Sequence, residues 1–182
     1  MEYGIWNTFR LTTMLQPLDV MLAIKLAVNR KSYTQAELAL ELDVSASQVN
    51  RALKRCEISG LIGKEDRQVI RPALIEFLVH GIKYAFPGEV GPVKRGMPTA
   101  HSALPFASKM GPTNVNYVWP VPTGELRGES VKPLYKTAPY AANLDSRFYE
   151  ALALIDAIRI GRAREINLAR KAIQTIIGKK YG

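Results

Sequence analysis

The sequence predicts an α+β protein that is mainly α-helical, because helical and non-helical patterns occupy separate parts of the chain. Apolar residues recur at helical spacing in residues 16–84 and again in 145–178. Between these zones, residues 85–140 hold 9 of the 11 prolines and 6 of the 13 glycines, too many for long helices. We therefore expect two helical zones joined by a segment of different character.

Composition limits the classes of function. The chain has 182 residues and a formal net charge of +9, which favours a polyanionic partner, either nucleic acid or an anionic membrane. Cys56 is the only cysteine, which excludes an internal disulfide and a cysteine-based zinc site. No apolar run approaches the roughly 20 residues that span a bilayer, and the first residues lack the pattern of a secretory signal. We expect a soluble, cytoplasmic protein.

Two helices are predicted at the start of the first zone. Pro17 suits the first turn of a helix that runs to about Asn29. Thr34 and Glu37 stand three residues apart, as in a capping box, so a second helix begins there. The inward apolar residues are Leu18, Leu22, Ile24 and Leu26 in the first helix and Leu38, Ala39 and Leu42 in the second.

A third helix and a small β-hairpin follow. The second helix stops before Asp43, a residue type that tolerates the left-handed conformation better than most. Ser45 caps the third helix, and Gly60 ends it. In residues 61–70, apolar ends flank a charged tip, which predicts a hairpin, and Pro72 then opens another helix. The inward face of the third helix is Val49, Ala52, Leu53 and Cys56.

This order of helix, short turn, helix and hairpin resembles the winged helix-turn-helix of bacterial regulators, including those of the MarR type. The resemblance covers residues 16–84 and rests on a distributed apolar pattern. Asp43 departs from the glycine often found at the turn of that motif. The matching apolar positions are Leu38, Leu42, Val44, Val49 and Leu53.

A second resemblance extends from about Met14 over nearly the whole chain. It is to a family of bacterial winged-helix proteins identified as MarR-like regulators, some of which accompany a nucleotidyltransferase-like toxin. The resemblance implies DNA binding and a partner protein, and it brings no catalytic residues. The segments that carry it are VNRALKR, LIEFLVHGIKYAFPGEVGPVKRGMPTAHSA, VWPVPTGELRGESVKPLY and LALIDAIRIGRARE.

The outward side of the third helix predicts how the protein would contact DNA. An α-helix fits the major groove, where Gln and Asn pair with adenine and Arg with guanine. Hydroxyl groups near a helix start suit a phosphate, and basic residues of the hairpin tip would reach a minor groove or phosphate. The alternative is a solvated polar face, or a protein-interaction module. The candidate DNA-binding residues are Thr34, Ser45, Ser47, Gln48, Asn50, Arg51, Lys54, Arg55, Lys64 and Arg67.

The middle segment is expected to be ordered. Residues 85–110 keep many large apolar side chains, which a disordered linker rarely does. After it, VNYVWPVP and ELRGESVKPLY, separated by Thr123 and Gly124, predict the two strands of a hairpin, with their prolines at edges. A small-ligand pocket lined by Tyr117, Trp119 and Tyr135 is the alternative to a satellite core here.

No catalytic residue, cofactor or metal site is predicted. Thr99, His101 and Ser102 do not make a triad without an orienting carboxylate, and His101 is expected to serve as a hydrogen-bonding residue of an ordered loop. His80 and His101 are the only histidines, too few for a His-rich metal site. An enzyme acting on nucleic acid would need gathered carboxylates, whereas those of the middle segment are scattered. They are Glu89, Glu125 and Glu129.

The C-terminal zone begins with a helix capped at Asp145-Ser146. Gly161 interrupts its apolar stripe, so either two helices meet there or one long helix bends. Three arginines gather at this junction and would contact DNA phosphates or an acidic partner, or form a solvated basic corner. They are Arg159, Arg162 and Arg164.

We expect a homodimeric, sequence-specific regulator, such as a repressor, because one recognition helix supplies little specificity and two can meet successive major grooves. The C-terminal part would dimerise, sense a ligand or engage a partner. The alternative is an antitoxin-like protein that binds and neutralises a partner protein. The expected divisions are a flexible arm at 1–15, a winged helix-turn-helix domain at 16–84, an ordered Pro/Gly-rich segment with a hairpin at 85–144, and C-terminal helices at 145–182.

Overall fold

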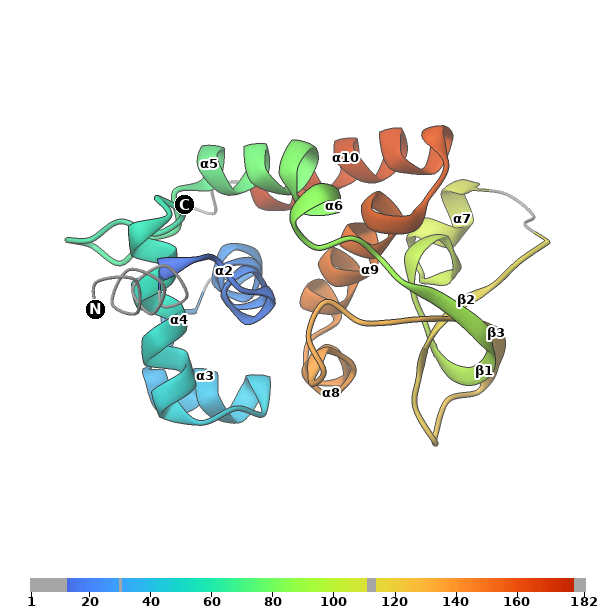
Figure 1. Cartoon of the computed structure of the whole chain (residues 1–182), viewed down its shortest axis with the longest axis horizontal. Coiled ribbons are helices and arrows are strands. Elements are labelled where there is room, and N and C mark those ends of the chain that lie inside the picture. Colours follow the sequence, from blue (N-terminus) through green and yellow to red (C-terminus); the bar gives the residue numbers. More distant parts are fainter. Residues whose placement is uncertain (1–12, 30, 111–113, 179–182) are drawn as a thin grey trace, which may run out of the picture.

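The computed structural model describes residues 13–29, 31–110 and 114–178. The predicted arm, residues 1–15, therefore lies almost wholly outside the described residues. The structure is α+β and mainly helical, as predicted (Figure 1). The order of elements is α2 (Pro17–Val28), α3 (Gln35–Leu42), α4 (Ala46–Ile58), α5 (Arg71–Glu76), a π-helical turn (Phe77–Gly81), α6 (Ile82–Ala85), β1 (Val90–Pro98), a 3-10 turn (Ala100–Ser102), α7 (Phe106–Met110), β2 (Tyr117–Pro120), β3 (Leu126–Val131), α8 (Ala138–Asn143), α9 (Ser146–Ile160) and α10 (Ala163–Gly178).

The caps predicted for the second and third helices are confirmed. Thr34 and Glu37 form a reciprocal capping box at the start of α3, and Ser45 and Gln48 form another at the start of α4. Asp43 ends α3 in the left-handed region, with φ 51° and ψ 54°. The turn between α3 and α4 is therefore fixed by local hydrogen bonds and by one residue that accepts a positive φ.

Residues 61–70 form a short hairpin with a single β-bridge, between Ile62 and Val69. The amide of Gly63 donates to the carbonyl of Gln68 at 2.8 Å, which closes the tip. Pro72 then lies in the first turn of α5, as predicted. The helix continues through the π-helical turn into α6, so residues 71–85 form one helical rod with a widened turn.

The segment 85–110 is ordered, as expected, but the sequence analysis expected irregular structure there and missed a strand. Residues 90–98 form β1, whose first part pairs antiparallel with β3 and whose last part pairs antiparallel with β2. The predicted hairpin of the two later strands is wrong, because β2 and β3 pair parallel to each other. The three strands form a small closed barrel. Pro92 lies at the register shift between Gly91 and Val93, where a bulge accommodates it.

Glycines permit this closure. A methyl group on Gly96 of β1 would overlap the carbonyl oxygen of Trp119, and one on Gly124 would overlap the backbone of Gly96. A methyl group on Gly128 of β3 would overlap the carbonyl oxygen of Asn116. The three backbones thus approach more closely than any other residue type would allow.

Two separate helices meet at Gly161, which settles the alternative left open by the sequence. Asp145 caps α9, and its carboxylate accepts from the amides of Arg147 and Phe148 at 3.0 Å each. Every residue of α9 from 151 to 158 is buried. In Figure 1, α9 lies between the N-terminal helices and the barrel, so it forms the centre of the molecule.

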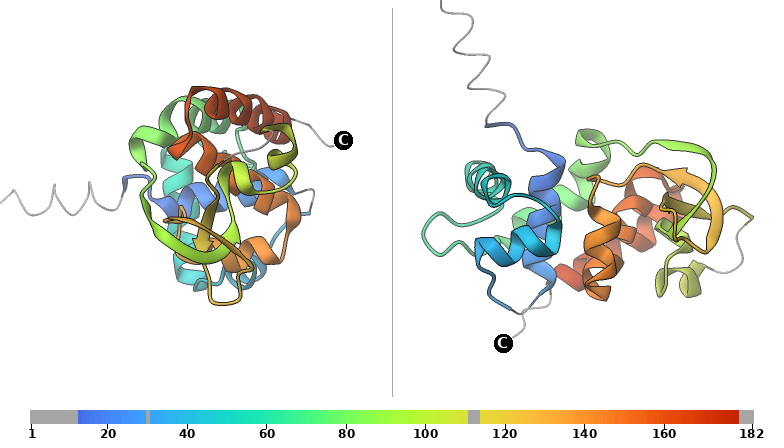
Figure 2. Two further views of the ribbon diagram at one scale, coloured as in Figure 1. Left: turned by 90° about the vertical axis from the view of Figure 1, so that its right-hand side faces the viewer. Right: turned by 90° about the horizontal axis from the view of Figure 1, so that it is seen from below.

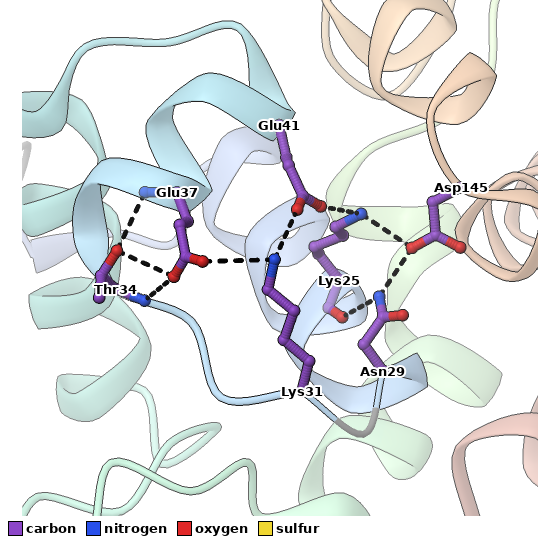
Figure 3. A network of polar contacts seen from close by, with 7 residues as sticks. All are labelled: Lys25, Asn29, Lys31, Thr34, Glu37, Glu41 and Asp145. Atoms are coloured by element: carbon purple, nitrogen blue, oxygen red, sulfur yellow. Dashed lines mark hydrogen bonds and ion pairs between the residues drawn. The ribbon is translucent and has the colours of Figure 1, made fainter.

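A buried lysine joins α9 to the N-terminal helices. Lys25 of α2 is fully buried, and its Nζ lies 2.7 Å from a carboxylate oxygen of Glu41 and 2.8 Å from one of Asp145. Asn29 donates to the same oxygen of Asp145 at 2.8 Å (Figure 3). The end of α2 and the end of α3 are thus joined to the start of α9 by charge-assisted hydrogen bonds.

Arg71 makes a second connection between the two helical zones. One Nη of Arg71 donates to the carbonyl of Ala27 in α2 at 2.8 Å and to that of Ile177 in α10 at 2.5 Å. The buried apolar residues of both zones and of the barrel form one continuous cluster. The further views in Figure 2 show the barrel at the end of the molecule opposite α4.

Candidate nucleic-acid interface

Helix α4 divides into a buried and an exposed face, much as its sequence predicts. Val49, Ala52 and Cys56 are fully buried and Leu53 nearly so. Burial raises the pKa of the Cys56 thiol, and its Sγ lies 3.3 Å from the carbonyl oxygen of Asp19. Cys56 is thus a core residue, as expected. The exposed face carries Ser47, Asn50, Arg51 and Lys54, a set that we call the α4 stripe.

The side chains of the α4 stripe make no hydrogen bond or ion pair within the part of the chain that the structure describes. Two carry positive charge, and none is acidic. The stripe is followed, one turn further on, by Ile58, which is 59% exposed. A polar and cationic helix face of this kind is free to contact an external ligand.

Arg55 does not belong to this exposed face, which corrects the prediction. Its side chain is 8% exposed, and its Nε and Nη2 each donate to one oxygen of Asp19 at 2.7 Å. Asp19 is fully buried in α2, and a buried carboxylate requires such a partner. Burial raises the pKa of Asp19, and the guanidinium of Arg55 opposes that rise. Arg55 therefore fixes α4 against α2.

Gln48 is half-buried and already engaged. Its Oε1 accepts from the amide and the hydroxyl of Ser45 at 3.0 and 3.1 Å, and its Nε2 donates to the hydroxyl of Tyr135 at 3.2 Å. Reading adenine would require breaking these contacts. Ser45 and Thr34 are exposed, and their hydroxyls accept from the amides of Gln48 and Glu37 as helix caps.

Lys64 and Arg67 lie exposed at the tip of the 61–70 hairpin. Two carboxylates, Glu65 and Asp66, stand between them in the sequence and are also exposed. An oxygen of Asp66 accepts from the amide of Gln68 at 3.0 Å, and Arg67 has a φ of 52°. The tip is therefore a tight turn with no net charge, and its two cations point to solvent beside two anions.

A hollow of about 410 Å³ adjoins the α4 stripe. It lies between the start of α2 and the middle of α4, and Tyr135 closes it from the C-terminal side. Arg51 reaches its rim from the exposed stripe. The hollow is lined by Gln16, Pro17, Leu18, Gln48, Arg51, Arg55 and Tyr135.

Thr99, His101 and Ser102 each make a hydrogen bond to another segment, and the hydrogen-bonding role predicted for His101 is confirmed. Thr99 donates its hydroxyl proton to Asp156 at 2.8 Å, and Ser102 accepts from the amide of Tyr117 at 2.9 Å. The Nε2 of buried His101 lies 2.7 Å from the carbonyl oxygen of Val115, and its Nδ1 lies 3.3 Å from a carboxylate oxygen of Glu165. The three side chains connect different segments of the barrel region.

Asp156 is the residue that sequence reasoning missed. It is 1% exposed, and it accepts from the indole N–H of Trp119 at 2.5 Å and from Arg159 at 2.6 Å. Trp119 is thus a core residue, but it belongs to the one continuous core and not to the satellite core that the sequence suggested. Arg159 also donates to the carbonyls of Phe86 and Pro87, so it forms neither a solvated corner nor a DNA contact. A lone aspartate in the apolar run ALALIDAI was the available signal.

Two further searches of the described residues gave negative results. No three His, Cys, Asp or Glu side chains gather where they could hold a metal ion. No described helix combines the length and apolar character needed to cross a bilayer.

No family model, curated protein or solved structure matches the chain.

Proposed function

We propose that the protein binds double-stranded DNA as a transcriptional regulator, with α4 in the major groove. In this proposal α3 and α4 act as a helix-turn-helix and the 61–70 hairpin acts as its wing. The observation that carries the proposal is the α4 stripe, which is polar, cationic and without partners in the described chain. Asn50 and Arg51 present the groups that pair with adenine and guanine edges.

The buried contacts of α4 support this role. Arg55 holds the helix to α2, and the Ser45–Gln48 capping box fixes its first turn. Gln48 also connects it to Tyr135. A recognition helix held in this way does not lose its orientation on binding, which lowers the entropic cost of complex formation.

The proposed division of labour can be tested with duplexes selected from a random library. Arg51→Ala should relax the preference at one base position by about 1–3 kcal/mol, while Lys64→Ala should weaken all sequences alike and lower the salt slope by about 1. The readout is footprinting and a binding isotherm at several stated salt concentrations. Lys109→Ala removes an exposed lysine from α7, outside the α4 stripe, the hairpin and the C-terminal helices, and serves as the control. Equal losses on every sequence for Arg51→Ala and Lys64→Ala would contradict the proposal.

A homodimer is part of the proposal, since two recognition helices read a palindromic site. The C-terminal helices are the proposed interface. Light scattering gives the molar mass in solution, and a mass of one chain at concentrations that saturate the duplex would rule out the dimeric form.

The alternative function is an antitoxin-like protein that neutralises a partner by direct binding. It is favoured by Tyr140 and Leu144, which stand four residues apart at the end of α8 and are 50% and 55% exposed. Neutralisation that persists in an Arg51→Ala, Lys54→Ala double variant and fails in a Tyr140→Ser, Leu144→Ser variant would support it. The reverse result would support DNA binding.

A further inference from the structure

The barrel carries a second cationic feature, far from α4. In the antiparallel ladder of β1 and β3, Arg95 stands directly opposite Arg127. Both side chains are exposed. Directly opposed residues of an antiparallel pair lie on the same face with their Cβ atoms about 5 Å apart. The two side chains therefore leave the same surface from neighbouring positions.

No carboxylate neutralises this pair. Within the described chain, neither arginine forms an ion pair or hydrogen bond through its side chain. Glu125 and Glu129 stand two residues before and after Arg127, and among the described residues neither forms an ion pair with either arginine. Like charges placed directly opposite each other destabilise a sheet, so the free protein carries an electrostatic cost that an anion would remove.

The backbone prevents the two arginines from separating. Each is followed by a glycine, Gly96 and Gly128, and these are two of the residues that pack against β2 without room for a methyl group. The strands that carry the guanidinium groups are thus fixed by the closure of the barrel. Two neighbouring guanidinium groups suit phosphate, because each presents a planar fork of donors to its oxygens.

We propose that Arg95 and Arg127 form a phosphate-binding site for the backbone of a nucleic acid, separate from α4. Both arginines lie on exposed strand surface, and neither lines the hollow beside α4, the one beside the 61–70 hairpin or the one between Glu89 and Lys136. An open surface binds a small phosphate compound only weakly, because tight binding of small ligands depends on enclosure, whereas a linear polyanion gains affinity there through successive phosphates. The net charge of +9 agrees with such a partner.

The position of the site gives it a role distinct from that of α4. The barrel and α4 lie at opposite ends of the long axis of the molecule (Figures 1 and 2). A nucleic acid bound at Arg95 and Arg127 would therefore be either a different molecule from the duplex at α4 or a distant part of that duplex. The inference shares a polyanionic ligand with the proposed function but does not depend on recognition by α4.

The test compares two double variants that each lose two positive charges. Arg95→Gln, Arg127→Gln removes the site, and Lys109→Gln, Lys136→Gln removes two exposed cations that lie outside the strands, α4 and the C-terminal helices. Binding of a random-sequence duplex is measured over a range of salt concentrations. For the first variant we expect the slope of log K against log salt to fall by about 2 in magnitude, and for the control a much smaller change. An unchanged affinity and slope in the first variant would overturn the inference.

Thermal unfolding in phosphate-free, low-salt buffer provides the second measurement and shows whether each variant is folded. Arg95→Gln alone should raise the melting temperature, because it removes the repulsion. Pyrophosphate should raise the melting temperature of the wild type and leave that of the double variant unchanged. Two results would overturn the assignment to nucleic acid. One is stabilisation of the wild type by pyrophosphate together with unchanged duplex binding by the double variant. The other is bound pyrophosphate that polyglutamate displaces and the duplex does not.

The same variants distinguish this inference from the proposed function. Arg95→Gln, Arg127→Gln should weaken all sequences equally and leave the base preference unchanged. Arg51→Ala should change the preference and leave the pyrophosphate effect intact. If substitutions in α4 have no effect on duplex binding while those in the barrel do, the proposed function fails and the barrel site stands.

Discussion

The N-terminal helices and the central helix α9 each contain one buried aspartate paired with an arginine, and the two pairs are built differently. Asp19 receives two of its three hydrogen bonds from a single residue, Arg55, and the third from the amide of Gln16. Asp156 receives one each from Thr99, Trp119 and Arg159. The first is a connection between two helices, and the second is a junction of several segments.

This difference determines what a substitution leaves behind. Removing Arg55 leaves Asp19 with one backbone donor, so a buried negative charge is nearly unpaired. Removing any single partner of Asp156 leaves two donors in place. Burial raises the pKa of both carboxyls, and the neighbouring arginine opposes the rise in each case. The junction should therefore tolerate the loss of a partner better than the helix–helix connection.

The largest expected effect is that of Arg55→Met. We expect a loss of about 3–5 kcal/mol in the free energy of unfolding, because it leaves a buried carboxylate without its counter-charge. Urea unfolding followed by circular dichroism measures it. Arg51→Met, four residues earlier on the exposed face of the same helix, should stay within about 0.5 kcal/mol of the wild type. Similar losses for the two variants would contradict the burial of Arg55.

A smaller effect is expected for Thr99→Val, which removes one neutral donor from Asp156 and nearly preserves the shape of the side chain. The expected loss is about 1–3 kcal/mol. Thr123→Val in the exposed loop before β3 is the matched control. The comparison of the two aspartates would fail if Thr99→Val destabilised the protein more than Arg55→Met does.

The smallest effect near neutral pH concerns Asp145 and Glu41, the carboxylates around Lys25. Burial alone would raise the pKa of each, but the hydrogen bonds from Lys25 and other donors outweigh it and hold both pKa values below normal. Their contribution is thus complete above the ordinary values of 3.8 and 4.5. It is lost as the pH falls through the lower folded-state values.

Lys25→Met isolates this contribution from that of other groups. Asp19 and Asp156, whose pKa values are raised, act in the opposite sense, since their protonation favours the folded state. The measured quantity is therefore the difference in unfolding free energy between the wild type and Lys25→Met. It should shrink as the pH is lowered from neutral to about 3. A difference that stays constant over this range would rule out the network as its source.

Local signals in the sequence were sufficient for the helical parts. The caps at Thr34, Ser45 and Asp145, the left-handed Asp43 and the break at Gly161 all depend on neighbouring residues, and all are confirmed. The exposed α4 stripe also followed from helical spacing. Such features need no knowledge of distant contacts, because short-range hydrogen bonding and steric preference determine them.

Long-range pairing could not be predicted in the same way. Strand β1 contains Pro92 and closely spaced glycines, which disfavour a strand until other strands pair with it. Arg55 follows an exposed lysine on α4, and only the buried Asp19 explains why it turns inward. The lone charges Asp19, Lys25 and Asp156 in apolar runs were the signal for these internal contacts, although none of them identifies its partner.

The bonds from Arg71 to α2 and α10 have a consequence for how such a protein can evolve. The side chain of Arg71 bonds to both α2 and α10. Cutting the chain after residue 85 would therefore expose apolar surface of the N-terminal part and leave polar groups there unpaired. Fusion of the N-terminal helical part to an unrelated C-terminal domain would remove the carbonyl of Ile177, which accepts from Arg71, and the carboxylate of Asp145, which pairs with Lys25. The N-terminal helical part and the C-terminal helices are therefore not separable modules.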